Sequence, residues 1–457
     1  MEYAGLIGSV ALLIWLALRG VNIILASLIS SLVVILTNGL PLAASLSEYY
    51  VFGPLGAFTF AGKFFLLFAA GAIFGRVMGD SHAASSIAMA LVRRLGAHRA
   101  LWITTLACAL LTYGGVVAFV VIFAIYPLGL KLLQEADIPK RLFCGALALG
   151  AGTFTLTTLP GTPSIHNVIS SVALGTDLFA GFWIATVGGA LMFIFGIWYL
   201  ERERVLAVER GEGFTPAPHD RISCVDERDY PHWLTASLPL ALVLLFIILP
   251  RVISMSIDMA ALAEGSLLRA VLLFANSQPI IWPSIALLAG SVVAAVLFPA
   301  IQREAMKVMG HGTQDSIMPL INTAAVIGFG GVVTHTAGFV DFTSFMLNSA
   351  LPPLLSMFAS ISLVSAITGS ATGGLQIFMQ TLAPSYLEMG IEPQVLHRIA
   401  TMASGGFDSL PHCGAIVAML TITGLTHKEA YRDVGVITVV IPVGVTLGMI
   451  ALIPLLG

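Results

Sequence analysis

The feature that most constrains this chain is a polar stretch inside a long apolar run, Gly150–Asn167, which reads GAGTFTLTTLPGTPSIHN. It holds five threonines, two prolines, a serine and a histidine. Non-helical backbone at membrane depth is tolerated only where it is buried in protein or lines a water-filled cavity, because lipid offers no hydrogen-bond partners. The stretch therefore predicts a membrane helix that is unwound at this point and faces a site.

A second stretch of the same kind lies late in the chain, Ser404–Gly414, which reads SGGFDSLPHCG. Interrupted apolar segments at corresponding places in two halves are the best indication that a sequence gives of a secondary transporter's binding site. We therefore expect the two interruptions to face one polar chamber.

Composition sets the broad class of protein. Of the 457 residues, 58% are hydrophobic and 10% are charged, whereas a soluble domain has about 25% charged residues. We expect an all-α polytopic membrane protein with no nucleic-acid partner, because no long basic or acidic tract occurs. No cofactor or metal is expected, and the cysteines are interpreted as free thiols because their spacing fits neither disulfides nor a metal site. They are Cys108, Cys144, Cys224 and Cys413.

The two halves of the chain carry the same order of segments. Residues 1–200 are the first predicted transmembrane repeat, residues 201–232 a charged cytoplasmic linker, and residues 233–457 the second repeat. Each repeat is predicted to hold about five transmembrane helices, one re-entrant hairpin and one broken helix. The hairpins are placed at 100–130 and 351–386, and the broken helices at 142–175 and 395–426.

Charge in the short loops sets the expected orientation, since basic residues mark the cytoplasmic side. Arg93, Arg94 and Arg99 are placed inside, and Glu48 in an outer loop at 38–54. The first hairpin has basic flanks and should enter from the cytoplasm, whereas the second has acidic flanks and should enter from outside. Each repeat then crosses the membrane an odd number of times, so the two are inverted, as in elevator or rocking transporters.

Two further segments have expected places. Ala4–Leu18 lacks a basic leader and a cleavage pattern, so it is expected to be the first membrane span and not a removable signal. Ala260–Ser277 is apolar but carries two charges, and it is expected to be an interfacial helix. The same segment is one candidate for a contact in a homodimer.

Several segments carry a family resemblance. They are LTYGGVVAFVVIFAIYPLG from Leu111, ADIPKRL from Ala136, LPGTPSIHNVI from Leu159, ITGSATGGL from Ile367, YLEMGI from Tyr386 and LHRIATMASGGFDSLPHCGA from Leu396. Along essentially its whole length the chain resembles the gluconate:proton symporter (gluconate permease) family, and most of all its branch of 3-hydroxybutyrate permeases. The wider ion-transporter superfamily shares two hairpins and two broken helices, which implies a substrate site where these four elements meet.

One departure from the family pattern concerns the substrate. Gluconate-type members carry a polar and aromatic block after the second interruption, where this chain reads Cys413–Val417 (CGAIV). The resemblance therefore implies a hydroxy acid shorter than a sugar acid.

A small anionic substrate needs hydrogen-bond donors, which helix N-termini and hydroxyl groups at broken helices supply in a membrane. Any one small or hydroxyl residue can instead serve helix packing, but clusters at matching places favour a site. The candidates for substrate binding are Thr112, Gly114, Gly115, Thr157, Thr158, Gly161, Thr162, Ser164, His166, Thr368, Ser370, Thr372, Gly373, Ser404, Gly405, Gly406, Ser409 and His412.

Asp408 is the candidate for proton coupling, together with His412. An ionisable group at membrane depth costs at least about 2.5 kcal/mol and should face a cavity or a partner. A carboxylic acid in apolar surroundings can bind and release a proton during a transport cycle. The structural alternative is that Asp408 caps the half-helix after Pro411 and never titrates.

The prediction is a proton-coupled symporter for a small hydroxycarboxylate, 3-hydroxybutyrate-like acids ahead of gluconate, in the cytoplasmic (inner) membrane of a bacterium. Sodium coupling and an uncoupled anion channel are alternatives, because similar repeats occur in both classes. The sequence contains no GxSxG, HExxH or Walker motif. A hydrolase built on Ser409 and His412 would lack a third, orienting group, so no enzyme is expected.

Overall fold

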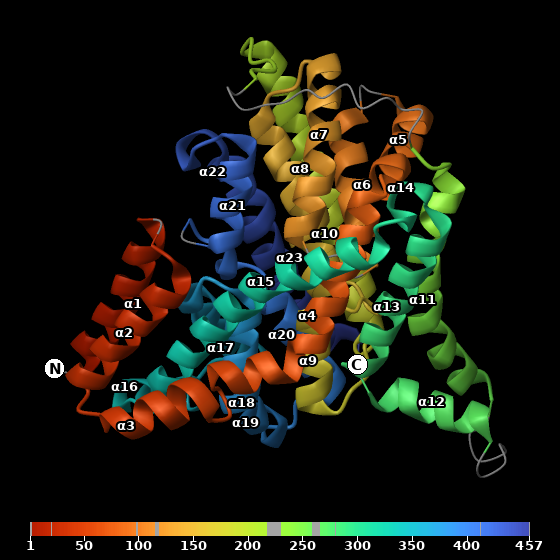
Figure 1. Ribbon diagram of the computed structural model, residues 1–457. Coiled ribbons are helices and arrows are strands. Elements are labelled where there is room, and N and C mark those ends of the chain that lie inside the picture. The colour runs from red at the N-terminus through yellow and green to blue at the C-terminus, as the bar shows by residue number, and fades with distance from the viewer. Residues whose placement is uncertain are drawn as a thin grey trace.

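The computed structural model describes residues 2–19, 21–96, 99–114, 118–216, 230–257, 266–278, 280–411 and 413–456. All regular structure within these ranges is helical, without a strand (Figure 1). A helix satisfies its own backbone hydrogen bonds, which is why an apolar chain in lipid adopts this structure. The prediction of an all-α membrane protein is confirmed.

Five of the described helical segments are long and apolar enough to cross a bilayer, for which about 20 apolar residues suffice. They are Leu42–Asp80, Phe182–Glu209, Trp233–Ser254, Ala305–Val333 and His427–Pro454. A pair of helices, α12 (Leu267–Ser277) and α13 (Ile281–Leu297), adds a sixth if it counts as one span, although it is bent by 106°. The other expected crossings fall on shorter helices, so helix length alone does not fix the number of spans.

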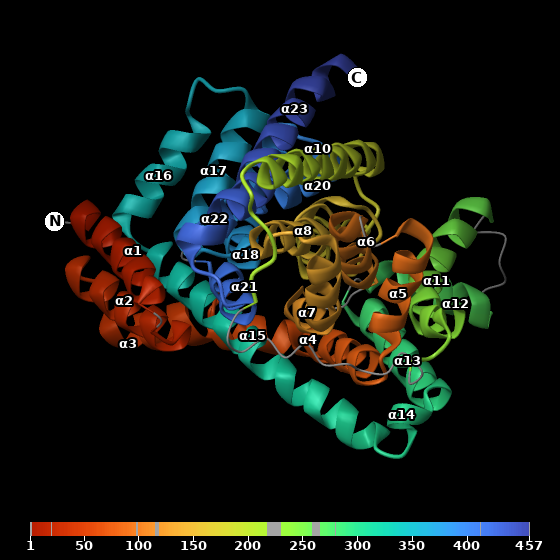
Figure 2. The same ribbon diagram turned by 90° about the horizontal axis from the view of Figure 1, so that it is seen from above.

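One group of helices, called the frame below, lies along the lower edge and both flanks of the view in Figure 2. Within it, α15 packs along α4, α2 and η1, and α13 packs between α4 and α11. The frame consists of α1 (Glu2–Leu18), α2 (Ile23–Thr37), α3 (Leu42–Ala44), η1 (Ser45–Phe52), α4 (Ala57–Asp80), α11 (Trp233–Ser256), α12, α13, α14 (Pro299–Gln302) and α15 (Ala305–Val333).

The second group of helices, called the bundle below, carries the interrupted segments. In it α6 packs on α7 and α8, α17 packs on α18 and α20, and α22 packs on α8. Its first part is α6 (Ala100–Tyr113), α7 (Ala118–Ala136), α8 (Lys140–Gly152), η3 (Phe154–Thr158), α9 (Ile165–Leu174) and α10 (Phe182–Glu209). Its second part is α17 (Pro353–Thr368), α18 (Ala371–Thr381), α19 (Ala383–Glu388), α20 (Pro393–Ser404), η5 (Phe407–Ser409), α21 (Gly414–Thr423), α22 (His427–Gly435), η6 (Val436–Val440) and α23 (Ile441–Leu456).

Two helices connect the frame to the bundle. The first, α5 (Ala83–Leu95), leads from α4 to α6, and the second, α16 (Ala337–Leu347), leads from α15 to α17. The order of frame helix, connecting helix and helix pair therefore occurs twice along the chain. This order supports two repeats, and their inverted orientation stays a prediction.

Charged residues separate between the two ends of the molecule. Figure 1 shows α5 and α22 toward the upper end and α3 and α16 toward the lower end. The last turn of α5 holds Arg93 and Arg94, and that of α22 holds Arg432. Glu48 follows α3 and Asp341 lies on α16. Under the positive-inside rule the upper end is expected to be the cytoplasmic one, and this orientation stays a prediction.

The expected outer loop at 38–54 is mostly helical, because α3 runs directly into the π-helix η1. Its Tyr50 is buried, and the hydroxyl oxygen lies 3.3 Å from Oγ of Ser27 on α2. Packing of η1 on α15 also holds the segment in place. The loop prediction was wrong because tertiary contacts order this backbone. The charge of Glu48, on which the prediction relied, does not reveal such contacts.

The helix α12 lies away from the bundle at the lower right of Figure 1. Leu267 and Leu273 on it are 80% and 53% exposed, whereas Leu272 is buried. An apolar helix that bends sharply from its neighbour fits the expected interfacial position, which stays a prediction together with the homodimer contact. Residues 258–265, the start of the expected segment, lie outside the described residues.

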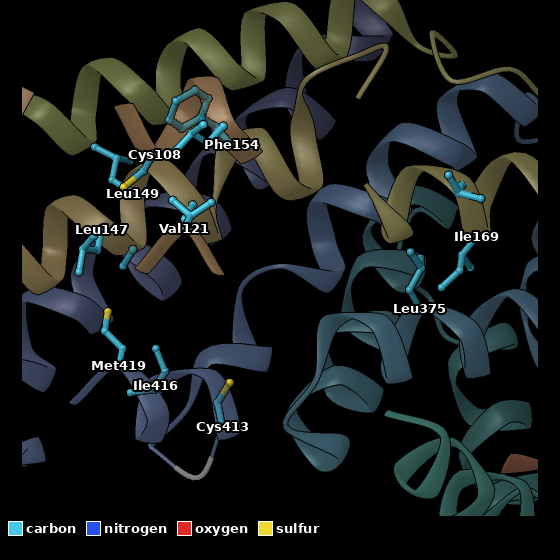
Figure 3. Packing of buried hydrophobic residues seen from close by; sticks show 14 of the residues in the cluster. Cys108, Val121, Leu147, Leu149, Phe154, Ile169, Leu375, Cys413, Ile416 and Met419 are labelled. Carbon is cyan, nitrogen blue, oxygen red and sulfur yellow. The ribbon is translucent and has the colours of Figure 1, made fainter. Parts of the chain in front are cut away.

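Buried apolar side chains fill the bundle around the interruptions (Figure 3). Cys108 of α6 and Leu149 of α8 lie together at one end of this view, and Ile169 of α9 lies next to Leu375 of α18 at the other. Cysteines contribute to this packing as free thiols, as expected, at Cys108, Cys144 and Cys413. Cys224 lies outside the described residues.

Close packing of α6 on α8 gives a first prediction. A Cβ on Gly150 would lie 2.4 Å from the carbonyl oxygen of Thr105 and 2.7 Å from Cβ of Cys108. Gly150→Ala should therefore push α8 away from α6 and destabilise the protein by about 1–3 kcal/mol. The measurement is thermal unfolding of the purified protein in detergent, where the variant should melt at a lower temperature.

Gly152 on the same helix provides the matched control, because a Cβ there meets nothing within 4 Å. Gly152→Ala should melt with the unmodified protein or slightly above it, since alanine favours a helix over glycine. Equal melting temperatures for the two variants would contradict the packing argument.

Candidate functional site

Two interruptions of the bundle helices, called the breaks below, touch one another. The first break is residues 153–164, between α8 and α9, and the second is residues 405–413, between α20 and α21. A Cβ placed on Gly405 would lie 2.5 Å from Cγ2 of Thr157, so the backbone of the second break rests on a side chain of the first. The two stretches that the sequence singled out are therefore neighbours in space.

The turns between paired helices, called the tips, reach the same place. At the first tip, between α6 and α7, the Tyr113 hydroxyl donates a hydrogen bond of 2.9 Å to the carbonyl oxygen of Pro160. Oγ1 of Thr162 donates to the Tyr113 carbonyl at 3.4 Å. At the second tip, between α17 and α18, Oγ1 of Thr372 lies 3.1 Å from Nε2 of His166. The tips and the first break thus form one contact region.

The N-termini of α9 and α18 converge at this His166–Thr372 contact. Each helix begins with a serine that caps it: Ser164 accepts a hydrogen bond from the Asn167 amide, and Ser370 accepts one from the Gly373 amide. His166 and Thr372 are the second residues of the two helices. A helix N-terminus carries a partial positive charge and free N–H groups, so two of them side by side favour an anion.

Asp408 lies at one of these N-termini. Its partly buried carboxylate accepts a hydrogen bond of 3.1 Å from the Ser409 hydroxyl. The short helix η5 that carries it packs on α18, and the carboxylate lies near the backbone N–H of Ala371, the first residue of α18. A carboxylate is stabilised at such a place by the helix dipole. The acid of the second break therefore occupies the anion position of the second tip.

The helix α22 holds the second break through two side-chain hydrogen bonds. Nε2 of His427 donates to the carbonyl oxygen of Pro411 at 2.8 Å, and the Tyr431 hydroxyl donates to that of Ser409 at 3.0 Å. These bonds satisfy carbonyl groups that the unwound backbone leaves without helical partners.

Arg398 and His397 of α20 hold the first break from the opposite half of the chain. The Arg398 guanidinium donates to the carbonyl oxygens of Thr158 at 3.0 Å and of Ala180 at 2.7 Å. Nδ1 of His397 lies 2.7 Å from Oγ1 of Thr176. Both residues are buried. The sequence analysis did not select them, although an arginine within an apolar segment is itself a signal of a functional site.

Asn167 connects these two residues to the loops around the first break. Its Nδ2 donates to the carbonyl oxygens of Thr162 and Leu178, both at 2.9 Å. Its Oδ1 accepts from Nε2 of His397 at 2.8 Å and from Arg398 at 3.3 Å. All four hydrogen-bonding positions of the buried amide are used, which fixes the first break rigidly.

Other predicted residues serve the architecture of the site. The Thr158 hydroxyl donates to the sulfur of Met192 on α10, so its side chain faces away from the second break. Gly114 packs against Leu240 of α11, and Gly161 has a φ of 78°, which a glycine adopts without strain.

The remaining candidates lie at the second tip and along the second break. The Thr368 hydroxyl donates to the carbonyl oxygen of Ser370 at 3.1 Å, which closes the second tip. The Ser404 hydroxyl donates to the Thr401 carbonyl within α20 at 2.7 Å, and Gly406 packs against Val443. Two candidates, Gly115 and His412, lie outside the described residues.

Two candidates keep a buried side-chain atom that has no hydrogen-bond partner in the part of the chain that the structure describes. These atoms are Oγ1 of Thr112 and Nδ1 of His166. A buried polar atom without a partner is unfavourable by about 1–3 kcal/mol. Both atoms are therefore suited to a hydrogen bond with a bound molecule.

Comparison with known proteins finds a family match along almost the whole chain. The family described as GntP family permease matches residues 3–456. The uncharacterized transporter YxjC of Bacillus subtilis (strain 168) is 36% identical over 462 residues, which are 96% of this chain and 96% of the relative. An uncharacterized transporter of Haemophilus influenzae is 23% identical over 76% of this chain and 74% of its own.

Solved structures share the fold. The YdaH transporter of Alcanivorax borkumensis matches with a TM-score of 0.57 and 14% identity over 86% of this chain and 85% of its own. MtrF of Neisseria gonorrhoeae, from a class of antimetabolite efflux pumps, matches with a TM-score of 0.53 and 12% identity over 90% of this chain and 82% of its own. At such low identity the likeness concerns the fold alone.

The hydrogen bonds of Asn167 give a second prediction. Asn167→Ala leaves Nε2 of His397 and two loop carbonyls without their partners inside the protein. Each such loss costs about 1–3 kcal/mol, so the variant should unfold at a clearly lower temperature in detergent.

Asn348, at the exposed end of α16, is the matched control because, among the described residues, its side chain bonds only to the Ser344 carbonyl of its own helix, at 2.8 Å. Asn348→Ala should change the melting temperature little. If Asn167→Ala melts like this control, the buried amide does not hold the first break.

Proposed function

As a member of the GntP permease family this chain is a secondary transporter, and we propose that it carries a small hydroxycarboxylate together with a proton. The family match confirms the resemblance expected from the sequence and makes the chain a permease, not an enzyme. It also supports a multi-pass protein of the bacterial inner membrane. The branch of 3-hydroxybutyrate permeases stays a prediction.

One observation carries the proposal: two helix N-termini meet at the His166–Thr372 contact, with the Asp408 carboxylate at one of them. This position suits the carboxylate group of a substrate as well as it suits Asp408. Binding the substrate there in place of an ionised Asp408 would bring two like charges together. A proton on Asp408 removes this repulsion, so the N-terminus of α18 can bind the carboxylate of the substrate.

Proton and substrate would then bind together. Protonated Asp408 can donate a hydrogen bond, while the substrate carboxylate accepts from the first turn of α18. The unpartnered atoms of Thr112 and His166 are suited to the hydroxyl group of the substrate. A carboxylate with a hydroxyl group nearby, and no long polyol, is the chemistry that this set of donors fits.

The length of the substrate follows from the start of α21. Gluconate-type members carry polar and aromatic residues after the second break, whereas this chain has Cys413–Val417. Cys413 is buried and packs with Ile416. An apolar wall offers no partners to the additional hydroxyls of a sugar acid, which supports a 3-hydroxybutyrate-like acid ahead of gluconate.

The arrangement of frame and bundle supports transport by relative motion of the two groups. Both breaks and both tips belong to the bundle. The helices α5 and α16 connect the frame to the bundle at opposite ends of the molecule. The site could therefore move with the bundle past the frame, as in an elevator or rocking transporter.

Uptake into proteoliposomes tests the proposal, with labelled 3-hydroxybutyrate and gluconate as probes. An inward proton gradient should drive accumulation of 3-hydroxybutyrate above its outside concentration. Equilibration without accumulation would favour a channel, accumulation that follows a sodium gradient would favour sodium coupling, and chemical change of the probe would favour an enzyme. A competition panel of unlabelled acids then orders the substrates.

The third prediction concerns the proton. Asp408→Asn should abolish accumulation, because the side chain no longer binds a proton, while exchange of labelled for unlabelled substrate across the membrane continues. Asp341→Asn, an exposed acid in the middle of α16, is the control and should accumulate substrate normally. Unchanged accumulation and pH dependence in Asp408→Asn would refute the role of Asp408.

A further inference from the structure

Arg398 is a buried cation without a partner of opposite charge at contact distance. The residue is 1% exposed, and the hydrogen bonds that its guanidinium makes to the described residues go to neutral carbonyl and amide oxygens. In the part of the chain that the structure describes, no carboxylate lies within 4.0 Å of its guanidinium. A guanidinium stays protonated in proteins. A permanent positive charge therefore lies inside the bundle.

The buried acids Glu203 and Asp433 of the bundle are paired. Both form ion pairs with Arg141 near the start of α8 and the ends of α10 and α22. Asp433 also accepts a hydrogen bond of 2.7 Å from the Tyr199 hydroxyl.

The buried cation Lys140 of α8 has its Nζ 5.9 Å from the centroid of the Tyr126 ring. Arg398 differs from Arg141 in that its guanidinium bonds to neutral oxygens and not to carboxylates.

Arg398 lies close to the candidate site. It bonds to the carbonyl oxygen of Thr158, whose neighbour Thr157 touches the second break at Gly405. Asp408 belongs to that same break. The two ionisable groups beside the site thus carry opposite charges and are held on one segment of chain, α20 with its following break.

The other titratable groups near Arg398 and Asp408 add no charge to this pair at neutral pH. His397 bonds to Asn167 and Thr176 through both ring nitrogens, as a neutral imidazole does. Tyr431 and Cys413 face Asp408 and are uncharged at neutral pH by their ordinary chemistry.

One more acid acts on Arg398 from a distance. Asp177, in the loop after α9, attracts the guanidinium electrostatically. It is partly exposed at the outer end of the molecule, and its Oδ1 accepts a hydrogen bond from the Phe179 amide. Water and salt screen an exposed charge much more than a buried one.

We propose that Arg398 is the fixed counter-charge of the transport cycle, which sets one proton per monoanionic substrate. This inference rests on the proposed function and adds its stoichiometry and substrate class. In the empty carrier the charges of Arg398 and ionised Asp408 cancel. In the loaded carrier Asp408 is protonated, and the single negative charge of the substrate cancels that of Arg398. Both forms that cross the membrane are then neutral.

Coupling follows from the two forms that are not neutral. An empty carrier with protonated Asp408 has one excess positive charge, and a carrier with substrate but no proton has one excess negative charge. Moving either through the low-dielectric interior is unfavourable. A dicarboxylate leaves an uncompensated negative charge as well, so the site should select monocarboxylates.

The first experiment measures stoichiometry in proteoliposomes, with labelled 3-hydroxybutyrate as the probe. At zero net flux, a gradient of one pH unit should support about tenfold accumulation, and a membrane potential set with potassium and valinomycin should not change it. Accumulation that rises with an inside-negative potential means more than one proton per substrate and overturns the charge balance while the proposed symport stands. No accumulation of any probe refutes the proposed function itself.

The second experiment is the fourth prediction and concerns Arg398 directly. In Arg398→Gln the loaded carrier bears one net negative charge, so coupled uptake should fall at least tenfold and the remaining exchange of labelled for unlabelled substrate should depend on the membrane potential. Arg398→Lys keeps the charge, and its exchange should not depend on the potential. Loss of structure alone would lower exchange equally at every potential. Exchange by Arg398→Gln that is independent of the potential would overturn the proposal.

Asp408→Asn supplies a measurement that does not depend on how well Arg398 variants fold. With a monoanion bound, this carrier is neutral only if the charge of Arg398 counts. Substrate exchange by Asp408→Asn should therefore proceed at the same rate with and without a membrane potential. A rate that depends on the potential would show that the loaded carrier bears net charge, which contradicts the assigned role of Arg398.

Discussion

The structure depends on one constraint: backbone that leaves the helix inside a membrane must find its hydrogen bonds within the protein. The first break meets it through side chains of α6, α9 and α20. Tyr113 bonds the Pro160 carbonyl, Asn167 that of Thr162, and Arg398 that of Thr158. The second break relies on His427 and Tyr431 of α22 in the same way. The Arg398 bond and the packing of Gly405 on Thr157 join the two parts of the bundle at these unwound segments.

The composition and the two polar stretches were sufficient to predict the class of fold and the position of both breaks. Prolines, glycines and hydroxyl residues at membrane depth leave few other structures open. The contact between Thr157 and Gly405 could be expected from the family resemblance, since that resemblance places both breaks at one site. The loop prediction at 38–54 failed, because packing of Tyr50 under α15 is a tertiary effect that local composition does not encode.

Arg398 and Asn167 show what sequence analysis of the site could not reach. Asn167 ends the first polar stretch and Arg398 precedes the second, but their roles depend on the neighbouring loop and on acceptors more than two hundred residues away. For the hydroxyl residues, the sequence selected some whose side chains point away from the second break. Thr157 and Thr158 are adjacent and were both selected, but the Thr158 hydroxyl bonds to Met192. Residue type located the site, whereas the direction of each side chain required the structure.

The two breaks differ in that the second carries an acid, and this difference bears on the proposed cycle. The first break has its carbonyls bonded by buried side chains, so it provides fixed geometry. The second break carries Asp408, whose carboxylate lies near the Ala371 amide at the second tip. A proton arriving at Asp408 weakens its attraction to the N-terminus of α18, since a neutral carboxyl group interacts with the helix dipole more weakly than a carboxylate. Protonation would then loosen the second tip at the moment when the substrate needs the amide, which joins the chemistry of the proton to movement of the bundle.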